Sequence, residues 1–239
     1  ADRSPQQLQK ESLASRILSF QFLTASRYGK LRRYLDPKGE SFLCPLFYLR
    51  FVYPGVTLSA KHETALLYTE PHYDVAYGLN GRSFWIPLQD TTAESGTICT
   101  FSPIVAAEFP PPGRNGKNYF NISKYLDEAP RVDELFSRPV QPIYLTQGDV
   151  LEFDNSFLHA ATKPTTMPRF SLNLRLLSEA EIRLASPKDQ NLIRRFNADI
   201  DGFNARNIQA LTSSEVPVEK LTWRDEYSWF RSGETNTLK

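Results

Sequence analysis

One stretch of the chain alternates without exception between polar and large apolar side chains. From Arg169 to Leu176, every odd-numbered residue is polar and every even-numbered residue is phenylalanine or leucine. Because successive side chains of a strand point to opposite faces of a sheet, the stretch predicts a strand with two different faces. In an ordinary antiparallel sheet the polar face would meet water. In a barrel the apolar face would pack outward against helices, and the polar residues would line a ligand cavity: Arg169, Ser171, Asn173 and Arg175.

Helical signals flank a strand-rich middle. Ser4-Pro5-Gln6-Gln7 combines an N-cap hydroxyl with proline at the first helical position, which predicts a helix over about residues 5–34, in one or two pieces. Ser178 with Glu181, and Ser186 before Pro187, predict two more helix starts. The last of these helices carries an apolar stripe of Ile193, Phe196, Ile200 and Phe203.

The middle of the chain consists of short β-branched and aromatic runs interrupted by proline, glycine and asparagine. So many short strands predict a mainly β domain, a sandwich or barrel, with flanking helices. We expect one domain, with a helical lead over about 1–40, a core over about 41–177, an insertion over about 103–142 and a helical extension over about 178–239. The predicted strands are 46–53, 65–69, 83–88, 97–101, 143–145, 150–153 and 169–177.

Composition argues against polyanion and membrane partners. The formal net charge is +1, from 28 basic and 27 acidic residues, so no long-range field would attract nucleic acid or an anionic membrane. No apolar run reaches the length of a membrane span, and the first residues are polar. The two cysteines, Cys44 and Cys99, suit buried thiols in a reducing compartment better than a disulfide scaffold, although two cysteines could also form one bridge. We therefore expect a cytoplasmic protein.

Two of the three histidines fall into a pattern typical of a mononuclear iron site. His72 and Asp74 stand two residues apart, so on an extended chain both side chains can reach one metal. His159 follows a predicted strand and would be the third ligand, and Arg169 follows it by ten residues. Two imidazoles and one carboxylate hold Fe(II) on one face and leave the other open. The alternative is that both histidines are core or loop residues; for His62, in a polar stretch, a surface position is the better interpretation.

The ordered set His72-x-Asp74, Gly148-Asp149-Val150-Leu151-x-Phe153, His159 and Arg169-x-Ser171 resembles the Fe(II)/2-oxoglutarate-dependent oxygenase superfamily. The 85 residues from Asp74 to His159 and the segment Phe84 to Asp90, followed by Glu94-Ser95-Gly96-Thr97, resemble its phytanoyl-CoA dioxygenase-like group. Phe101-Ser102-Pro103-Ile104 stands where that group commonly has Pro-Gly-Ser-His. The resemblance implies a double-stranded β-helix, or cupin-like jelly roll.

The same resemblance implies the chemistry. His72, Asp74 and His159 would hold Fe(II), and 2-oxoglutarate would chelate it, with O2 at the last metal position. Arg169 would bind the far carboxylate of 2-oxoglutarate through a bidentate pair, and Ser171 through its hydroxyl. The products would be succinate, CO2 and an oxidised, most simply hydroxylated, small molecule. Because related halogenases lack the carboxylate, Asp74 favours hydroxylation over halogenation. The connection over 103–142 would close over the site as a lid, or be a surface excursion.

Substrate residues follow less directly from the sequence. Asn173 and Arg175 share the polar face of Arg169, and a second inward arginine would suit an anionic substrate, but Arg175 could equally pair with a buried acid. Trp85 is either a substrate contact or a core residue, and Tyr48 with Arg50 would form another wall. Two other functions stay open. One is a cupin-like iron enzyme that does not use 2-oxoglutarate, with Arg169 holding the substrate; the other is a catalytically silent binding module.

Overall fold

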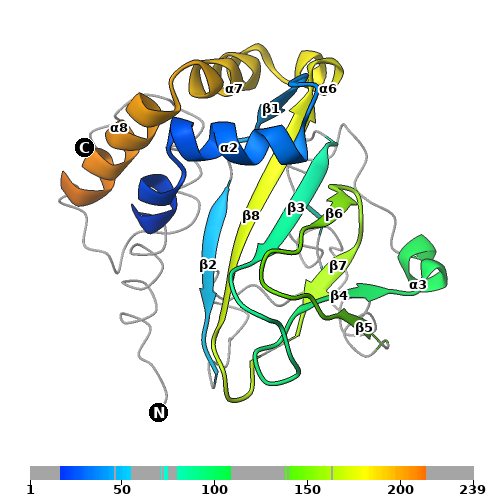
Figure 1. Cartoon of the computed structure of the whole chain (residues 1–239). Coiled ribbons are helices and arrows are strands. Elements are labelled where there is room, and N and C mark those ends of the chain that lie inside the picture. Colours follow the sequence, from blue (N-terminus) through cyan, green and yellow to red (C-terminus); the bar gives the residue numbers. More distant parts are fainter. Residues whose placement is uncertain are drawn as a thin grey trace.

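In the described part of the chain, the strands form one sheet of five and one of three, all antiparallel (Figure 1). This computed structural model describes residues 17–45, 47–54, 71, 73–74, 80–108, 138, 140–162 and 164–213. The larger sheet contains β1 (Ser41–Leu43), β2 (Tyr48–Val52), β3 (Arg82–Pro87), β6 (Leu151–Asp154) and β8 (Arg169–Ser178). The smaller sheet has the order β5 (Val140–Ile143), β4 (Ile98–Phe101) and β7 (His159–Ala161).

Strand β8 is the centre of the larger sheet, and its two faces differ as the sequence predicts. It pairs with β1 and β2 along one edge and with β3 along the other. Leu172, Leu174 and Leu176 lie in a core cluster that also contains residues of the helices. The opposite face is buried as well, which excludes the interpretation that it meets water; its residues are Arg169, Ser171, Asn173 and Arg175.

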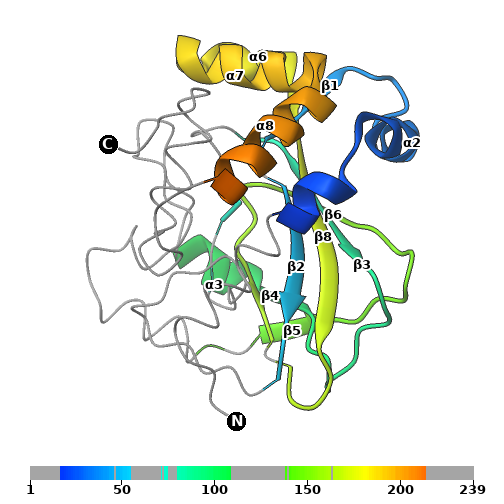
Figure 2. The ribbon, with the colours of Figure 1, turned by 90° about the vertical axis from the view of Figure 1, so that its left-hand side faces the viewer.

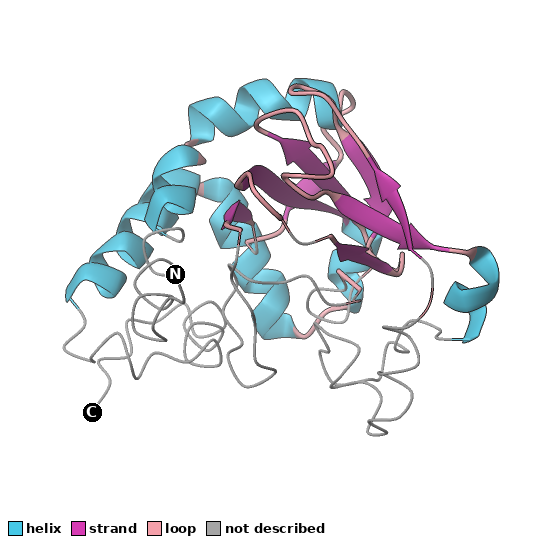
Figure 3. Ribbon diagram, turned by 90° about the horizontal axis from the view of Figure 1, so that it is seen from below, coloured by secondary structure: helices cyan, strands magenta, loops and turns pink. Residues whose placement is uncertain are grey.

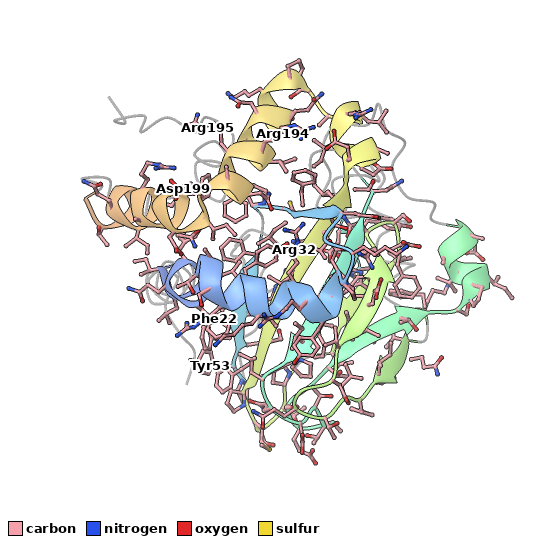
Figure 4. The ribbon with its side chains drawn as sticks, turned by 45° about the horizontal axis from the view of Figure 1, so that its top comes forward. Phe22, Arg32, Tyr53, Arg194, Arg195 and Asp199 are labelled. Carbon is pink, nitrogen blue, oxygen red and sulfur yellow. The ribbon has the colours of Figure 1, made fainter. Side chains whose placement is uncertain are left out.

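The helices cover the apolar face of the larger sheet. They are α2 (Ala25–Leu35), α6 (Glu179–Leu184), α7 (Pro187–Ala198) and α8 (Ile200–Ser213), and each contributes to the same core cluster. Figure 2 shows α6 and α7 along the upper end of the sheet, with α8 descending beside it. A further short helix, α3 (Pro103–Glu108), stands apart from these helices (Figure 3). Arg32 of α2 reaches the start of β1, where Nη2 donates to Ser41 O at 3.0 Å (Figure 4).

The predicted helix starts in the second half of the chain are confirmed. Ser178 caps α6 by accepting from Glu181 N, and Ser186 caps α7, with Pro187 at its first turn. The predicted apolar stripe is buried throughout, although it continues from α7 into α8. At the N-terminal end, residues 17–22 and α2 form two helical pieces, because Thr24 caps a new helix by accepting from Arg27 N. Residues 1–16 lie outside the described residues.

Several strand predictions need correction. The strand expected at 143–145 is β5 at Val140–Ile143, and β1 and β7 were not predicted. The expected strand at 65–69 and most of the expected lid, 109–137, lie outside the described residues. The described strands form no closed barrel, so the jelly roll stays a prediction. Both cysteines are buried and neither forms a disulfide, which agrees with buried thiols and not with a bridge.

We expect Ser186→Ala to lower the free energy of unfolding by about 1 kcal/mol, the usual cost of losing an N-cap side chain. The Ser186 hydroxyl accepts from Asp189 N at 3.2 Å and donates to Asp189 Oδ2 at 2.7 Å. Ser186→Thr keeps the hydroxyl and serves as the control. Urea denaturation followed by circular dichroism measures both variants; equal stability of Ser186→Ala and the parent would contradict the role of this cap.

Candidate metal and ligand site

The polar face of β8 lies against the smaller sheet. Arg169 Nη1 donates to Thr97 O at 3.2 Å and to Thr162 O at 2.9 Å, next to β4 and β7. The ring of Phe153, on β6, packs against His159, on β7, with centroids 4.7 Å apart. These contacts bring together residues that are far apart in the sequence, so the predicted site residues that the structure describes share one buried region.

Asp74 is held from three directions. Its backbone N–H donates to Asn155 O at 2.9 Å, Ser83 Oγ lies 2.9 Å from Oδ2, and Arg175 Nη2 donates to Oδ1. Ser83 and Arg175 converge because they stand directly opposite each other in the pairing of β3 with β8. The carboxylate is buried, with 4% of the side chain exposed, and its Oδ2 lies toward His159. The protein therefore fixes the orientation of this candidate ligand.

Ser83 and Asn155 also surround Asp74, although the sequence motifs do not include them. Ser83 Oγ lies 2.6 Å from the side-chain amide of Asn155, and both residues are buried. A hydroxyl carries one proton, so Ser83 can donate to Asp74 and accept from Asn155 only if the amide presents its nitrogen. The alternation of β3 could have identified Ser83, because it shares the face of Trp85. No sequence signal marks Asn155.

His159 is arranged as a neutral ligand. Its Nδ1 lies 3.0 Å from Phe157 O, which assigns the ring proton to Nδ1 and leaves a lone pair on Nε2. Burial lowers the pKa of His159, against the opposing effect of Asp74, and so favours the neutral imidazole. Nε2 lies 3.9 Å from Asp74 Oδ2. These two atoms, which would both bind the metal, therefore already face each other in the metal-free protein.

The third predicted ligand, His72, lies outside the described residues, as does His62. Within the described ranges no three histidine, cysteine, aspartate or glutamate side chains form a group that could hold a metal. His159 and Asp74 therefore fit two positions of the predicted triad, while the position of His72 stays a prediction.

Arg169 is a buried cation without an acidic partner among the described residues. Only 3% of the residue is exposed, both of its hydrogen bonds come from Nη1 to backbone carbonyls, and Nε has no hydrogen-bond partner. Desolvation, with a smaller contribution from Arg50, lowers the pKa of Arg169 to about 10. A buried guanidinium without a counter-ion is costly. The Nε and Nη2 edge is thus suited to the carboxylate of a ligand.

The remaining predicted residues continue the same face. Ser171 stands opposite Arg50 of β2 and Pro87 of β3, and Asn173 stands opposite Trp85. All of Ser171, Asn173 and Trp85 are buried, and Trp85 faces away from the helix-covered core that contains Phe84 and Ile86. Arg175 differs from the others, since it pairs with Asp74. The interpretation that Arg175 pairs with a buried acid therefore agrees with the structure. The second arginine near Arg169 is Arg50, whose charge acts on Arg169.

Comparison with known proteins gives matches in structure only. No family model matches the sequence, and no curated protein matches it. Within the described residues, no helix has both the length and the hydropathy needed to cross a bilayer.

Three of the solved structures that match are of proteins described with alpha ketoglutarate. The epimerase SnoN, in complex with Fe3+, alpha ketoglutarate and nogalamycin RO, is 19% identical, with 67% of this chain and 57% of SnoN covered and a TM-score of 0.40. The alpha ketoglutarate dependent carbocyclase SnoK is 16% identical, with 59% of this chain and 51% of SnoK covered and a TM-score of 0.39. CytC3 with Fe(II) and alpha-ketoglutarate is 14% identical, with 59% of this chain and 47% of CytC3 covered and a TM-score of 0.34. The chain thus spans about half the length of these proteins. The SnoN and CytC3 structures contain iron and alpha ketoglutarate, and SnoK is described as alpha ketoglutarate dependent.

Proposed function

We propose that this protein is a non-haem Fe(II)- and 2-oxoglutarate-dependent oxygenase of the phytanoyl-CoA dioxygenase-like group, folded as one jelly-roll domain, that hydroxylates a small molecule. The observation that carries the proposal is the environment of Arg169. Its guanidinium is buried and has no acidic partner among the described residues. It lies on the polar face of β8, the face directed toward Asp74 and His159. A dicarboxylate that reaches from the metal to this arginine would supply the missing counter-charge.

The metal would be held by His72, Asp74 and His159. When bound, iron supplies the activation of O2 that couples decarboxylation of 2-oxoglutarate, to succinate and CO2, with oxidation of the substrate. The protein contributes orientation. Phe157 O directs the Nε2 lone pair of His159, and Ser83 with Arg175 turns Asp74 Oδ2 toward that lone pair. Such contacts to the ligands preserve the geometry that the metal requires.

The far carboxylate of 2-oxoglutarate would lie between Arg169 and Ser171. Both residues are at the end of β8 beyond Asn173, whereas Arg175, which holds Asp74, stands toward the other end of the strand. One strand would therefore carry both the co-substrate anchor and the support of a metal ligand. Trp85 and Asn173 lie between them and would face the substrate. The presence of Asp74 supports hydroxylation over halogenation, because its carboxylate would bind the metal where the related halogenases bind a halide.

The test is an anaerobic titration of 2-oxoglutarate into the Fe(II) protein. We expect a visible charge-transfer band, because only a co-substrate that chelates iron through its keto oxygen produces one. Glutarate, which has both carboxylates but no keto group, is the matched control and should give no band. Absence of the band with 2-oxoglutarate, together with no binding by calorimetry, would contradict the proposal. A cupin-like iron enzyme or a silent binding module would then be the better interpretation.

We expect Ser171→Ala to weaken 2-oxoglutarate binding by roughly tenfold to 150-fold. A hydrogen bond to a charged group contributes about 1.5 to 3 kcal/mol, and 1.4 kcal/mol is a factor of ten. Fe(II) affinity should not change, since Ser171 is not a proposed ligand. Thr165→Ala removes an exposed hydroxyl and is the control. Calorimetry measures all three proteins; unchanged binding by Ser171→Ala would remove this residue from the anchor.

A further inference from the structure

The ion pair of Asp74 and Arg175 differs from the other arginine–carboxylate pairs of the described residues. Its side chains are 4% and 2% exposed. Every other such pair in the described ranges has at least one side chain that is 35% exposed or more. Desolvation makes a pair as buried as this one expensive, and replacing it by apolar residues is often neutral or favourable. A contribution to stability therefore does not explain why this buried ion pair is present.

The position of Arg175 suggests that reason. Its guanidinium holds Oδ1 of Asp74, while Ser83 Oγ lies 2.9 Å from Oδ2, the oxygen 3.9 Å from His159 Nε2. The arginine thus occupies one side of the carboxylate, and the other side is directed to the second candidate ligand. A metal bound between Oδ2 and Nε2 would share the carboxylate with a fixed positive charge.

We propose that Arg175 is a resident counter-ion of Asp74. It holds the carboxylate in place and turned toward His159 in the metal-free protein, and its charge lowers the affinity of the site for a divalent cation. This inference rests on the proposed metal site and assigns Arg175 a positioning role, not a substrate contact. The site therefore binds a metal more weakly, but its carboxylate is already ordered before the metal binds.

The electrostatic consequence has a definite sign. A divalent cation and a guanidinium that share one carboxylate repel each other, and in a buried site this repulsion is weakly screened. Removing the charge while keeping the side-chain volume should therefore tighten cation binding. Without a metal, the same change takes a positively charged partner from a buried carboxylate, which destabilises the fold. A role limited to structure would produce the loss of stability but no gain in metal affinity.

The experiment is a calorimetric titration of Co(II), which is stable in air, into the parent and three variants. We expect Arg175→Met to bind Co(II) at least about tenfold tighter, equivalent to about 1.4 kcal/mol. Arg175→Lys keeps the charge and should stay within about threefold of the parent. The control is Arg82→Met, which removes an arginine of β3 that pairs with Glu152 at 3.1 Å and is 40% exposed. Equal or weaker Co(II) binding by Arg175→Met would overturn the inference.

Thermal unfolding provides a second readout. Metal-free Arg175→Met should melt below the parent and gain more from Co(II), because a cation that binds only the folded state stabilises it in proportion to its affinity. The double variant Asp74→Asn with Arg175→Met removes both charges and should regain stability while losing the response to Co(II). If Arg175→Met stays unfolded even with Co(II) while the double variant folds, the cation cannot replace the arginine and the inference is wrong.

The outcomes separate this inference from the proposed function. If the parent binds Co(II) and Arg175→Met binds it no tighter, only the role of Arg175 is wrong. If Arg175→Met binds Co(II) and the parent does not, the counter-ion role is supported in its strongest form. If neither protein binds Co(II), the metal site itself is wrong and both proposals are overturned.

Discussion

His159→Ala is expected to abolish turnover and to weaken Fe(II) binding by more than about a hundredfold, while the domain stays folded. Loss of a residue that only supports a metal ligand already costs about 10- to 100-fold in affinity, so loss of a ligand should cost more. His159 is buried on β7 with Nε2 directed toward Asp74, and its Nδ1 is held by Phe157 O. An anaerobic Fe(II) titration, with circular dichroism to verify folding, measures the effect.

The chain provides a matched control for this variant. His62→Ala removes another of the three histidines, from a polar stretch flanked by Lys61 and Glu63. We expect its Fe(II) affinity and turnover to equal those of the parent. If His159→Ala bound Fe(II) as tightly as the parent, the assignment of His159 as a ligand would be incorrect. A loss of affinity in both histidine variants would mean that the ligand set includes a residue outside the predicted triad.

Arg169→Ala is expected to weaken 2-oxoglutarate binding by about 30-fold to several thousandfold. Truncating one partner of a buried charge pair costs about 2 to 5 kcal/mol, partly because the other charge is left without a partner, and each 1.4 kcal/mol is a factor of ten. The effect should be large here because Arg169 is 3% exposed and its Nε has no hydrogen-bond partner within the described part of the chain. The measurement is the anaerobic titration of 2-oxoglutarate into the Fe(II) protein.

The control for Arg169 is Arg183→Ala, which removes an arginine of α6 that is 73% exposed and pairs with Glu179. Neither variant should change Fe(II) affinity. If Arg169→Ala bound 2-oxoglutarate as well as the parent does, the carboxylate anchor would lie elsewhere. Arg50 would be the next candidate, because it stands opposite Ser171 and its charge acts on Arg169.

Local patterns in the sequence were sufficient where one element determines its own structure. The alternation over Arg169–Ser178 predicted both the strand and the side that packs against the helices. Capping residues predicted the starts of α6 and α7, since a cap is a contact between residues three apart. Strands β1 and β7 escaped prediction because three residues are too few to show an alternation, and both exist through pairing with β8 and β4.

The candidate site shows the same division between local and long-range information. Motif order in the sequence selected Asp74, His159, Arg169 and Ser171 as candidates, and all four are buried in the structure. The sequence did not decide that Arg175 holds Asp74, that Ser83 and Asn155 complete its surroundings, or that Arg169 has no acidic partner among the described residues. The Arg175 contact joins residues 101 positions apart, and the Ser83 to Asn155 contact joins residues 72 apart. Periodicity assigns a side chain to a face, but only the register between strands decides which side chain it meets there.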